Sequence, residues 1–146
     1  MRKRYSIVIG QRRGIILLPD ENMYVVLNPM ERTLYRLFLS HPEGIIADSL
    51  PAYWQELCAI YEQESCFDDK PLRDNAMESL CSESKKVFYS TVSRIKKKFV
   101  SALGTRKAAP FIIRRGKDCR YRTRATLAKP DSCAFCVRQT PQYSLL

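Results

Sequence analysis

Short apolar runs mark the first 27 residues of the chain, and apolar positions at helical spacing follow them. The runs are rich in Val, Ile and Tyr, and the turn-forming stretches 10–14 and 19–22 separate them. Apolar runs bounded by Gly, Pro, Asn and Asp are typical of β-strands. The pattern predicts an antiparallel β-meander with strands at Tyr5–Ile9, Gly14–Leu18 and Met23–Leu27.

A helix is predicted to begin at Asn28. Asn28 can cap it, Pro29 suits the first helical position, and Glu31 can accept a hydrogen bond from the backbone of the cap. Apolar residues then recur every three or four positions, at Met30, Leu34, Leu37 and Phe38. Residues 41–44 end this helix. We expect His41, the only histidine, to interact with the helix dipole rather than to act as a ligand or a base.

A second helix is expected to start at Asp48 or Ser49, one of which would cap it, with Pro51 in its first turn. Its aromatic residues lie at helical spacing, which favours a place in the core over a cofactor site. The apolar stripe consists of Leu50, Tyr53, Trp54, Leu57, Ile60 and Tyr61. Glu62–Arg73 is polar and aperiodic, so we predict a solvated loop there without a metal site.

A third helix is predicted to begin near Asp74–Asn75 or after Ser82 and to run to about Leu103, closing at Gly104. One face is apolar, with Phe88, Val92, Ile95, Phe99 and Ala102 at alternating spacings of four and three. The opposite face carries cations with small hydroxyl residues between them: Lys86, Ser90, Ser93, Arg94, Lys97 and Ser101, flanked by Lys96 and Lys98. Such a face can lie against a polyanion without a bulky obstacle.

A basic β-hairpin is predicted after this helix. Phe111–Ile113 would form one strand, Gly116–Asp118 the turn, and Cys119–Arg124 the returning strand. Six cations decorate it: Arg114, Arg115, Lys117, Arg120, Arg122 and Arg124. The pattern dissolves beyond Ala125, so the sequence predicts one domain over residues 1–125 and a tail, partly ordered at best, over 126–146.

Charge is distributed very unevenly along the chain. Residues 84–146 contain 16 Lys or Arg and only two acids, Asp118 and Asp131, which gives a net charge of +14. Residues 1–83 contain 9 Lys or Arg and 13 Asp or Glu, which gives −4. Such an asymmetry indicates that the C-terminal part of the chain attracts a polyanion.

Several classes of function are disfavoured by the composition. No stretch approaches the ~18 apolar residues of a membrane span, and the apolar run after Met1–Arg4 ends at Gly10, too early for a signal peptide. We therefore expect a cytoplasmic protein without membrane contact and with reduced cysteines. Cys133 and Cys136 form a single CxxC without further ligands, so no metal or other cofactor is expected. The sequence shows no nucleophile–base pair of the kind that a catalytic site needs, so we do not expect an enzyme.

A basic helix followed by a basic hairpin fits double-stranded DNA, because the major groove admits one α-helix and affinity comes mainly from cations on phosphates. The alternative is an interaction module that uses the same surface on an acidic protein partner without binding DNA. The residues that the pattern places on the DNA-facing surface are Lys86, Ser90, Ser93, Arg94, Lys97, Arg114, Arg115, Lys117 and Arg120.

Three segments also carry a family resemblance. Leu27–Gly44 reads as the start of a first helix, Val92–Phe99 as a recognition helix, and Phe111–Gly116 with Tyr121 as a wing. In this order they resemble the winged-helix effector domain of OmpR/PhoB-type response regulators. The resemblance implies an α+β winged helix-turn-helix with three helices and a hairpin wing, in a transcriptional regulator that reads duplex DNA. It implies DNA contacts by Thr91, Ser93, Arg94, Lys96 and Arg115.

The chain also departs from this family. The family's receiver domain is not expected here, residues 62–83 are longer than the corresponding region, and the wing turn reads Gly-Lys-Asp-Cys-Arg-Tyr. The region at 62–83 contacts RNA polymerase or neighbouring regulators in the resembling proteins, so RNA polymerase or another regulator is a candidate partner, and the role of the longer region here is left open. Two half-sites would further imply a homodimer on DNA.

Overall fold

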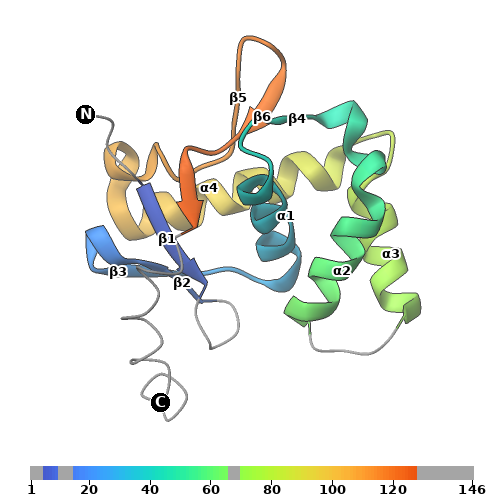
Figure 1. The fold of residues 1–146 in the computed structure, drawn as a ribbon, viewed down its shortest axis with the longest axis horizontal. Coiled ribbons are helices and arrows are strands. Elements are labelled where there is room, and N and C mark those ends of the chain that lie inside the picture. Colours follow the sequence, from blue (N-terminus) through green and yellow to red (C-terminus); the bar gives the residue numbers. More distant parts are fainter. Residues whose placement is uncertain (1–4, 10–14, 66–69, 128–146) are drawn as a thin grey trace.

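The computed structural model describes residues 5–9, 15–65 and 70–127, and it has a mixed α+β architecture with an open sheet (Figure 1). These residues form four α-helices, two short 3₁₀ helices and seven strands in two sheets. The helices are α1 (Pro29–Ser40), α2 (Trp54–Ser65), α3 (Lys70–Leu80) and α4 (Lys86–Ala108). None of the helices in these ranges is long and apolar enough to cross a membrane.

The larger sheet contains the predicted meander. Its strand order is β3-β2-β1-β7, and the strands are β1 (Tyr5–Ile9), β2 (Ile15–Leu18), β3 (Met23–Val26) and β7 (Ala125–Leu127). The pairings β1–β2 and β2–β3 are antiparallel, which confirms the meander. Strand β7 lies parallel to β1, with Ala125 opposite Tyr5. The expected loss of pattern after Ala125 is therefore wrong for residues 126 and 127, and residues 128–146 lie outside the described part.

The smaller sheet has the order β4-β6-β5, with β4 (Ile45–Ile46), β5 (Arg114–Arg115) and β6 (Arg120–Arg122). The predicted strand at Phe111–Ile113 is wrong, because those residues form a buried turn just before β5. The Phe111 N–H donates to Ala108 O at 2.9 Å, and the Phe111 carbonyl accepts from the hydroxyls of Tyr35 and Thr123. Backbone groups satisfied in this way are not available for a strand ladder.

Helix α1 begins as predicted. The Glu31 N–H donates to the Asn28 side chain at 2.8 Å, and the Asn28 N–H donates back to the Glu31 carboxylate at 2.9 Å. This reciprocal pair satisfies two backbone donors that a helix start leaves without partners. The apolar stripe of α1 is buried at Leu34, Leu37 and Phe38.

The start of the second helix differs from the prediction. A 3₁₀ helix, η2 (Ala47–Tyr53), precedes α2, and neither Asp48 nor Ser49 caps it, because its N-cap is Ile46 and no side chain bonds there. Pro51 has no N–H to donate, and the Trp54 N–H bonds to the Pro51 carbonyl three residues back. The first turn is therefore tightened, and the α-helix begins only at Trp54.

The predicted solvated loop at Glu62–Arg73 is also wrong. Residues 62–65 belong to α2, and α3 is a separate helix from Lys70, so the described residues form four α-helices where three were predicted. Polar Glu64 is only 7% exposed, and Met77 and Leu80 of α3 are fully buried. Glu64 is the partner of the buried Arg32, a role that periodicity does not reveal.

Helix α4 has the predicted apolar face, since Phe88, Ile95 and Phe99 are fully buried. Gly104 interrupts its regular geometry with φ 83°, a left-handed conformation that glycine adopts without strain. Aromatic rings join α4 to the rest of the core: Phe99 stacks on Phe111 at 5.8 Å between ring centroids and lies 5.3 Å from Tyr35. Burial raises the pKa of Tyr35, whose hydroxyl donates to Phe111 O at 2.7 Å.

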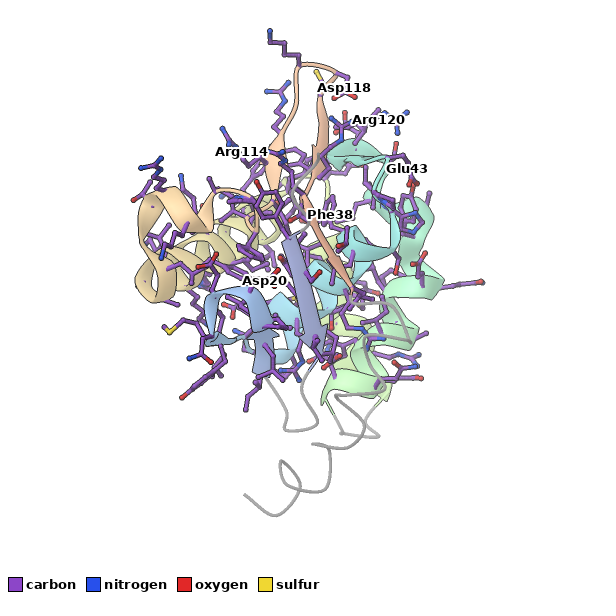
Figure 2. All side chains as sticks on the ribbon, turned by 60° about the vertical axis from the view of Figure 1, so that its left-hand side comes forward. Asp20, Phe38, Glu43, Arg114, Asp118 and Arg120 are labelled. Atoms are coloured by element: carbon purple, nitrogen blue, oxygen red, sulfur yellow. The ribbon has the colours of Figure 1, made fainter. Side chains whose placement is uncertain are left out.

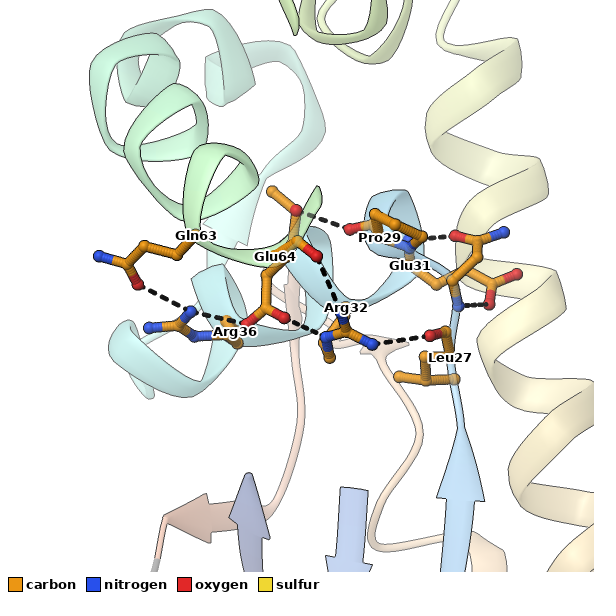
Figure 3. Close-up of polar contacts among 9 residues, drawn as sticks. Leu27, Pro29, Glu31, Arg32, Arg36, Gln63 and Glu64 are labelled. Carbon is orange, nitrogen blue, oxygen red and sulfur yellow. Dashed lines mark hydrogen bonds and ion pairs between the residues drawn. The ribbon is translucent and has the colours of Figure 1, made fainter. Parts of the chain in front are cut away.

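A buried ion pair joins α1 to α2 (Figure 3). The guanidinium of Arg32, 2% exposed, pairs with the Glu64 carboxylate and donates to the carbonyls of Leu27 at 2.9 Å and Glu64 at 3.1 Å. Arg36 donates to the other Glu64 oxygen at 2.7 Å and to Gln63 at 3.0 Å. Glu64 is therefore the shared carboxylate partner of two arginines at the contact between the helices.

We predict that Glu64→Gln lowers the free energy of unfolding by about 3 kcal/mol, because it leaves the buried Arg32 charge without its counter-ion. Glu62→Gln is the matched control, since Glu62 is 51% exposed and pairs with Arg73 at the surface. That change should cost less than about 1 kcal/mol. Urea denaturation measures both, and equal losses for the two variants would contradict the role assigned to Glu64.

Candidate nucleic-acid interface

The hairpin β5–β6 projects from the body of the molecule, with Arg114, Asp118 and Arg120 along it and Glu43 beside its base (Figure 2). Its turn is closed by the Gly116 N–H, which donates to Arg120 O at 2.8 Å, and by the Cys119 N–H, which donates to Gly116 O at 3.1 Å. Cys119 has φ 66°, in the left-handed region that glycine prefers. The turn thus forms without a glycine at this position, at some cost in backbone strain.

The base of the hairpin is tied to the turn after α1. Arg120 donates to Gly44 O at 3.2 Å and Arg122 donates to Glu43 O at 3.1 Å. Gly44 has φ 96°, and a Cβ there would lie 2.9 Å from Cβ of Arg120. Only glycine allows this close approach. Of the hairpin cations predicted to bind DNA, Arg120 is therefore already engaged with backbone.

His41 fixes the same turn from the other side. Its Nε2 lies 2.9 Å from Glu56 on α2, its Nδ1 lies 3.1 Å from Glu43, and its ring packs edge-on against Tyr53 at 4.8 Å. Burial alone would lower the pKa of His41, but the hydrogen bonds and charges of Glu56 and Glu43 outweigh it and raise the pKa above 6.5. His41 thus bridges two carboxylates, an arrangement beyond the predicted dipole interaction.

Aromatic side chains pack the hairpin against α4. The ring of Tyr121 on β6 contacts Phe88 edge-on at 5.2 Å and lies 6.4 Å from Tyr89, both in the first turn of α4. Phe88 is fully buried, whereas Tyr89 is 48% exposed. The hairpin therefore lies beside the N-terminal half of α4, next to the border of the helix that carries Tyr89.

The cations predicted on the polar face of α4 are exposed. Lys86, Arg94, Lys96 and Lys97 have no hydrogen bond or ion pair to their side chains within the described ranges, and Ser90 and Ser93 lie exposed among them. On the hairpin, Arg114, Arg115 and Lys117 are exposed, with Arg115 donating to the Cys119 sulfur at 3.2 Å. We define the basic surface as these residues together with Tyr89 and Arg120.

Thr91 does not reach this surface. It is 2% exposed, and its hydroxyl donates to Val87 O at 2.6 Å inside the helix. Lys98 is turned to the opposite border of α4, where it pairs with the buried Glu31. The family resemblance placed Thr91 at bases or phosphates, whereas the structure gives it a packing role.

Positions around α4 differ in their distance from the hairpin. At about 100° per residue, Ser93 and Lys96 follow Tyr89 on the border that faces the hairpin, whereas Arg94 lies about 140° around the helix from Tyr89. Sequence reasoning had not singled out Tyr89. The sequence did contain a signal for it, because an aromatic residue between the apolar stripe and the cationic face of a helix is unusual where that face only contacts solvent.

Many cations outside the basic surface face carboxylates. Arg32 and Arg36 pair with Glu64, and Arg73 pairs with Glu62 and Asp74. Lys85, just before α4, pairs with Asp48 at 2.5 Å. Among the residues that the structure describes, unpaired positive charge is therefore concentrated on α4 and the hairpin, which suits an anionic ligand.

No group of three or more His, Cys, Asp or Glu suited to a metal ion occurs among the described residues. Cys133 and Cys136 lie outside them. Searches against protein-family models, curated proteins and solved structures gave no significant match to this chain. The class of the site therefore has to be argued from its own geometry and charge.

We predict that Cys119→Gly stabilises the protein by about 0.5–1 kcal/mol, because glycine removes the strain of the left-handed backbone at the tip of the hairpin. Loss of the Arg115 contact to the sulfur limits the gain. Thermal unfolding of the variant beside Cys119→Ala, which keeps the Cβ and the strain, measures the effect. A Cys119→Gly protein less stable than Cys119→Ala would contradict it.

We predict that His41 makes stability depend on pH. A pKa raised on folding contributes stability that is fully present below the unfolded value of about 6.5 and is lost as the pH rises through the folded value. The difference in unfolding free energy between the unmodified chain and His41→Gln should be larger at about pH 6 than at about pH 8. A difference that stays constant or grows with pH would show that the carboxylates do not bind the protonated ring.

Proposed function

We propose that this protein binds double-stranded DNA as a winged helix, with α4 in the major groove and the hairpin β5–β6 as the wing on the adjacent groove or backbone. The order of elements supports this arrangement: strands, α1, β4, α2, α4, then a hairpin whose second strand pairs with β4. Helix α3 is an additional element before α4. On this view the protein is a transcriptional regulator, and α3 with the end of α2 is available to RNA polymerase or another regulator.

One observation supports the proposal most strongly. Tyr121 packs against Phe88 and Tyr89, so the hairpin is held beside the first turns of α4, and both elements carry exposed cations without carboxylate partners. The N-terminal residues of a recognition helix are those that contact base edges. In α4 these turns carry Lys86, Ser90 and Ser93.

The chemistry of the exposed residues suits both kinds of DNA contact. Lysines such as Lys97 suit phosphates, which fix position without reading sequence. Arg94 can donate two hydrogen bonds to the edge of a guanine. The basic surface therefore combines a sequence-independent part with a residue able to read a base.

We predict salt-dependent binding to duplex DNA. If about 4–6 phosphates are neutralised, the logarithm of the association constant should fall against the logarithm of salt concentration with a slope of about −4 to −5. Lys97→Ala should weaken binding to all sequences and reduce the slope by about 1, whereas Arg94→Ala should cost about 1–3 kcal/mol and relax specificity at one position. Fluorescence anisotropy with duplexes selected from a random pool measures these values.

Lys107→Ala is the control for this experiment, because it removes one charge from an exposed lysine beyond the kink at Gly104. It should leave the salt slope unchanged. Equal losses for Lys97→Ala and Lys107→Ala would mean that only net charge matters. A flat salt profile for the unmodified chain would exclude the proposed mode of DNA binding.

A groove on the opposite border of α4 favours a second candidate function, the binding of an acidic protein partner. It has a volume of about 480 Å³, with apolar residues of β3 on one side and lysines of α4 on the other. Its lining comprises Met23, Tyr24, Val25, Val26, Lys97, Lys98, Ser101 and Ala102. A flat salt profile with DNA, together with tight binding of an acidic protein that Val26→Asp abolishes, would support this function instead.

A further inference from the structure

We propose that Tyr89 contacts DNA bases directly, with its ring packed on the methyl group of a thymine at the seam between α4 and the wing. This inference rests on the proposed DNA binding. It adds a contact on the same surface, and the charge pattern of the chain did not indicate that contact. The seam is defined by Tyr89, Tyr121 and Arg115.

The first argument is the position of Tyr89. It lies in the first turn of α4, the part of a recognition helix that approaches base edges. It also faces the hairpin, since its ring is 6.4 Å from that of Tyr121. A base edge reached by the start of α4 beside the wing therefore meets this ring before it meets Arg94, which lies farther around the helix.

The second argument is exposure. Tyr89 is 48% exposed although it belongs to a cluster whose other members are buried or half-buried: Phe88, Phe38 and Tyr121. Packing of the hairpin needs only the side of the ring that meets Tyr121. The remaining apolar area faces solvent within the basic surface, where a methyl group of a bound base can cover it.

The third argument is the charge around the ring. Arg115 lies opposite Tyr121 in the hairpin, and the ring of Tyr121 lies 6.4 Å from that of Tyr89, while Lys96 lies two turns farther along the same border of α4. These cations bring phosphates to both sides of the ring. Thymine presents its methyl group in the major groove, where apolar side chains recognise it.

The test uses the full chain and the duplex that it selects from a random pool. Each thymine of that duplex is replaced in turn by deoxyuridine, which removes only the methyl group. One replacement should weaken binding of the unmodified protein about fourfold, the value of one buried methyl-sized group. The same replacement should have no effect on binding of Tyr89→Ala.

Two further variants separate the ring from its hydroxyl and from general packing. Tyr89→Phe keeps the ring and should bind like the unmodified chain, with the same sensitivity to deoxyuridine. Tyr61→Ala removes a half-buried tyrosine on α2 and should keep that sensitivity too. Unfolding curves of all variants show whether the hairpin stays in place.

Several results would overturn the inference while leaving DNA binding intact. If Tyr89→Phe loses as much affinity as Tyr89→Ala and no deoxyuridine matters, the contact is a hydroxyl bond to phosphate. If no thymine methyl couples to Tyr89, the residue only supports the hairpin. Failure of the unmodified chain to bind any duplex would instead overturn the proposed function itself.

Discussion

The packing of Phe88 determines where the charged surface lies. Phe88 is fully buried in the first turn of α4 and contacts Phe38 of α1 at 6.4 Å and Tyr121 of the hairpin at 5.2 Å. A hairpin with strands of two and three residues cannot be stable alone, so it depends on this contact and on its pairing with β4. The position of the hairpin cations relative to α4 thus depends on an apolar contact, together with the β4 pairing and the bonds of Arg120 and Arg122 to the backbone of residues 44 and 43.

Cations in the body of the molecule and cations on the basic surface differ in whether they have carboxylate partners. In the body, Glu64 pairs with two arginines and Glu31 pairs with Lys98 at the edge of α4, so each of these cations has a carboxylate partner. On α4 and the hairpin, most other described cations have no carboxylate partner; the exceptions are Arg122, which pairs with Asp118 at 2.6 Å, and Lys107, which lies 3.8 Å from Glu21. Carboxylates beside Arg94 or Lys97 would add little stability at an exposed site and would weaken the attraction for an anion.

Features set by neighbouring residues could be predicted from the sequence, and features set by distant residues could not. The capping box at Asn28 and Glu31 and the strands of the meander follow from local patterns, and so does the break in regular geometry at Gly104, although α4 continues beyond the predicted end to Ala108. Helix α3, the buried Glu64 and the pairing of β7 with β1 depend on partners that lie far away in the chain; Arg32 and Glu64, for example, are 32 residues apart. Helical periodicity predicted which cations of the site are exposed. It did not predict the roles of Thr91 and Tyr89, because burial decides the role of Thr91 and contact with the hairpin decides that of Tyr89.

The two borders of α4 are chemically distinct, and this bears on what the helix can bind at one time. The hairpin border presents Tyr89 with Arg115, whereas the β3 border presents Tyr24 and Val26, both more than half exposed. Lys97 lines the groove on the β3 border and also belongs to the basic surface. A duplex whose phosphates engage Lys97 takes that lysine from the groove, so DNA and an acidic partner would compete for it even though the apolar parts of their sites are separate.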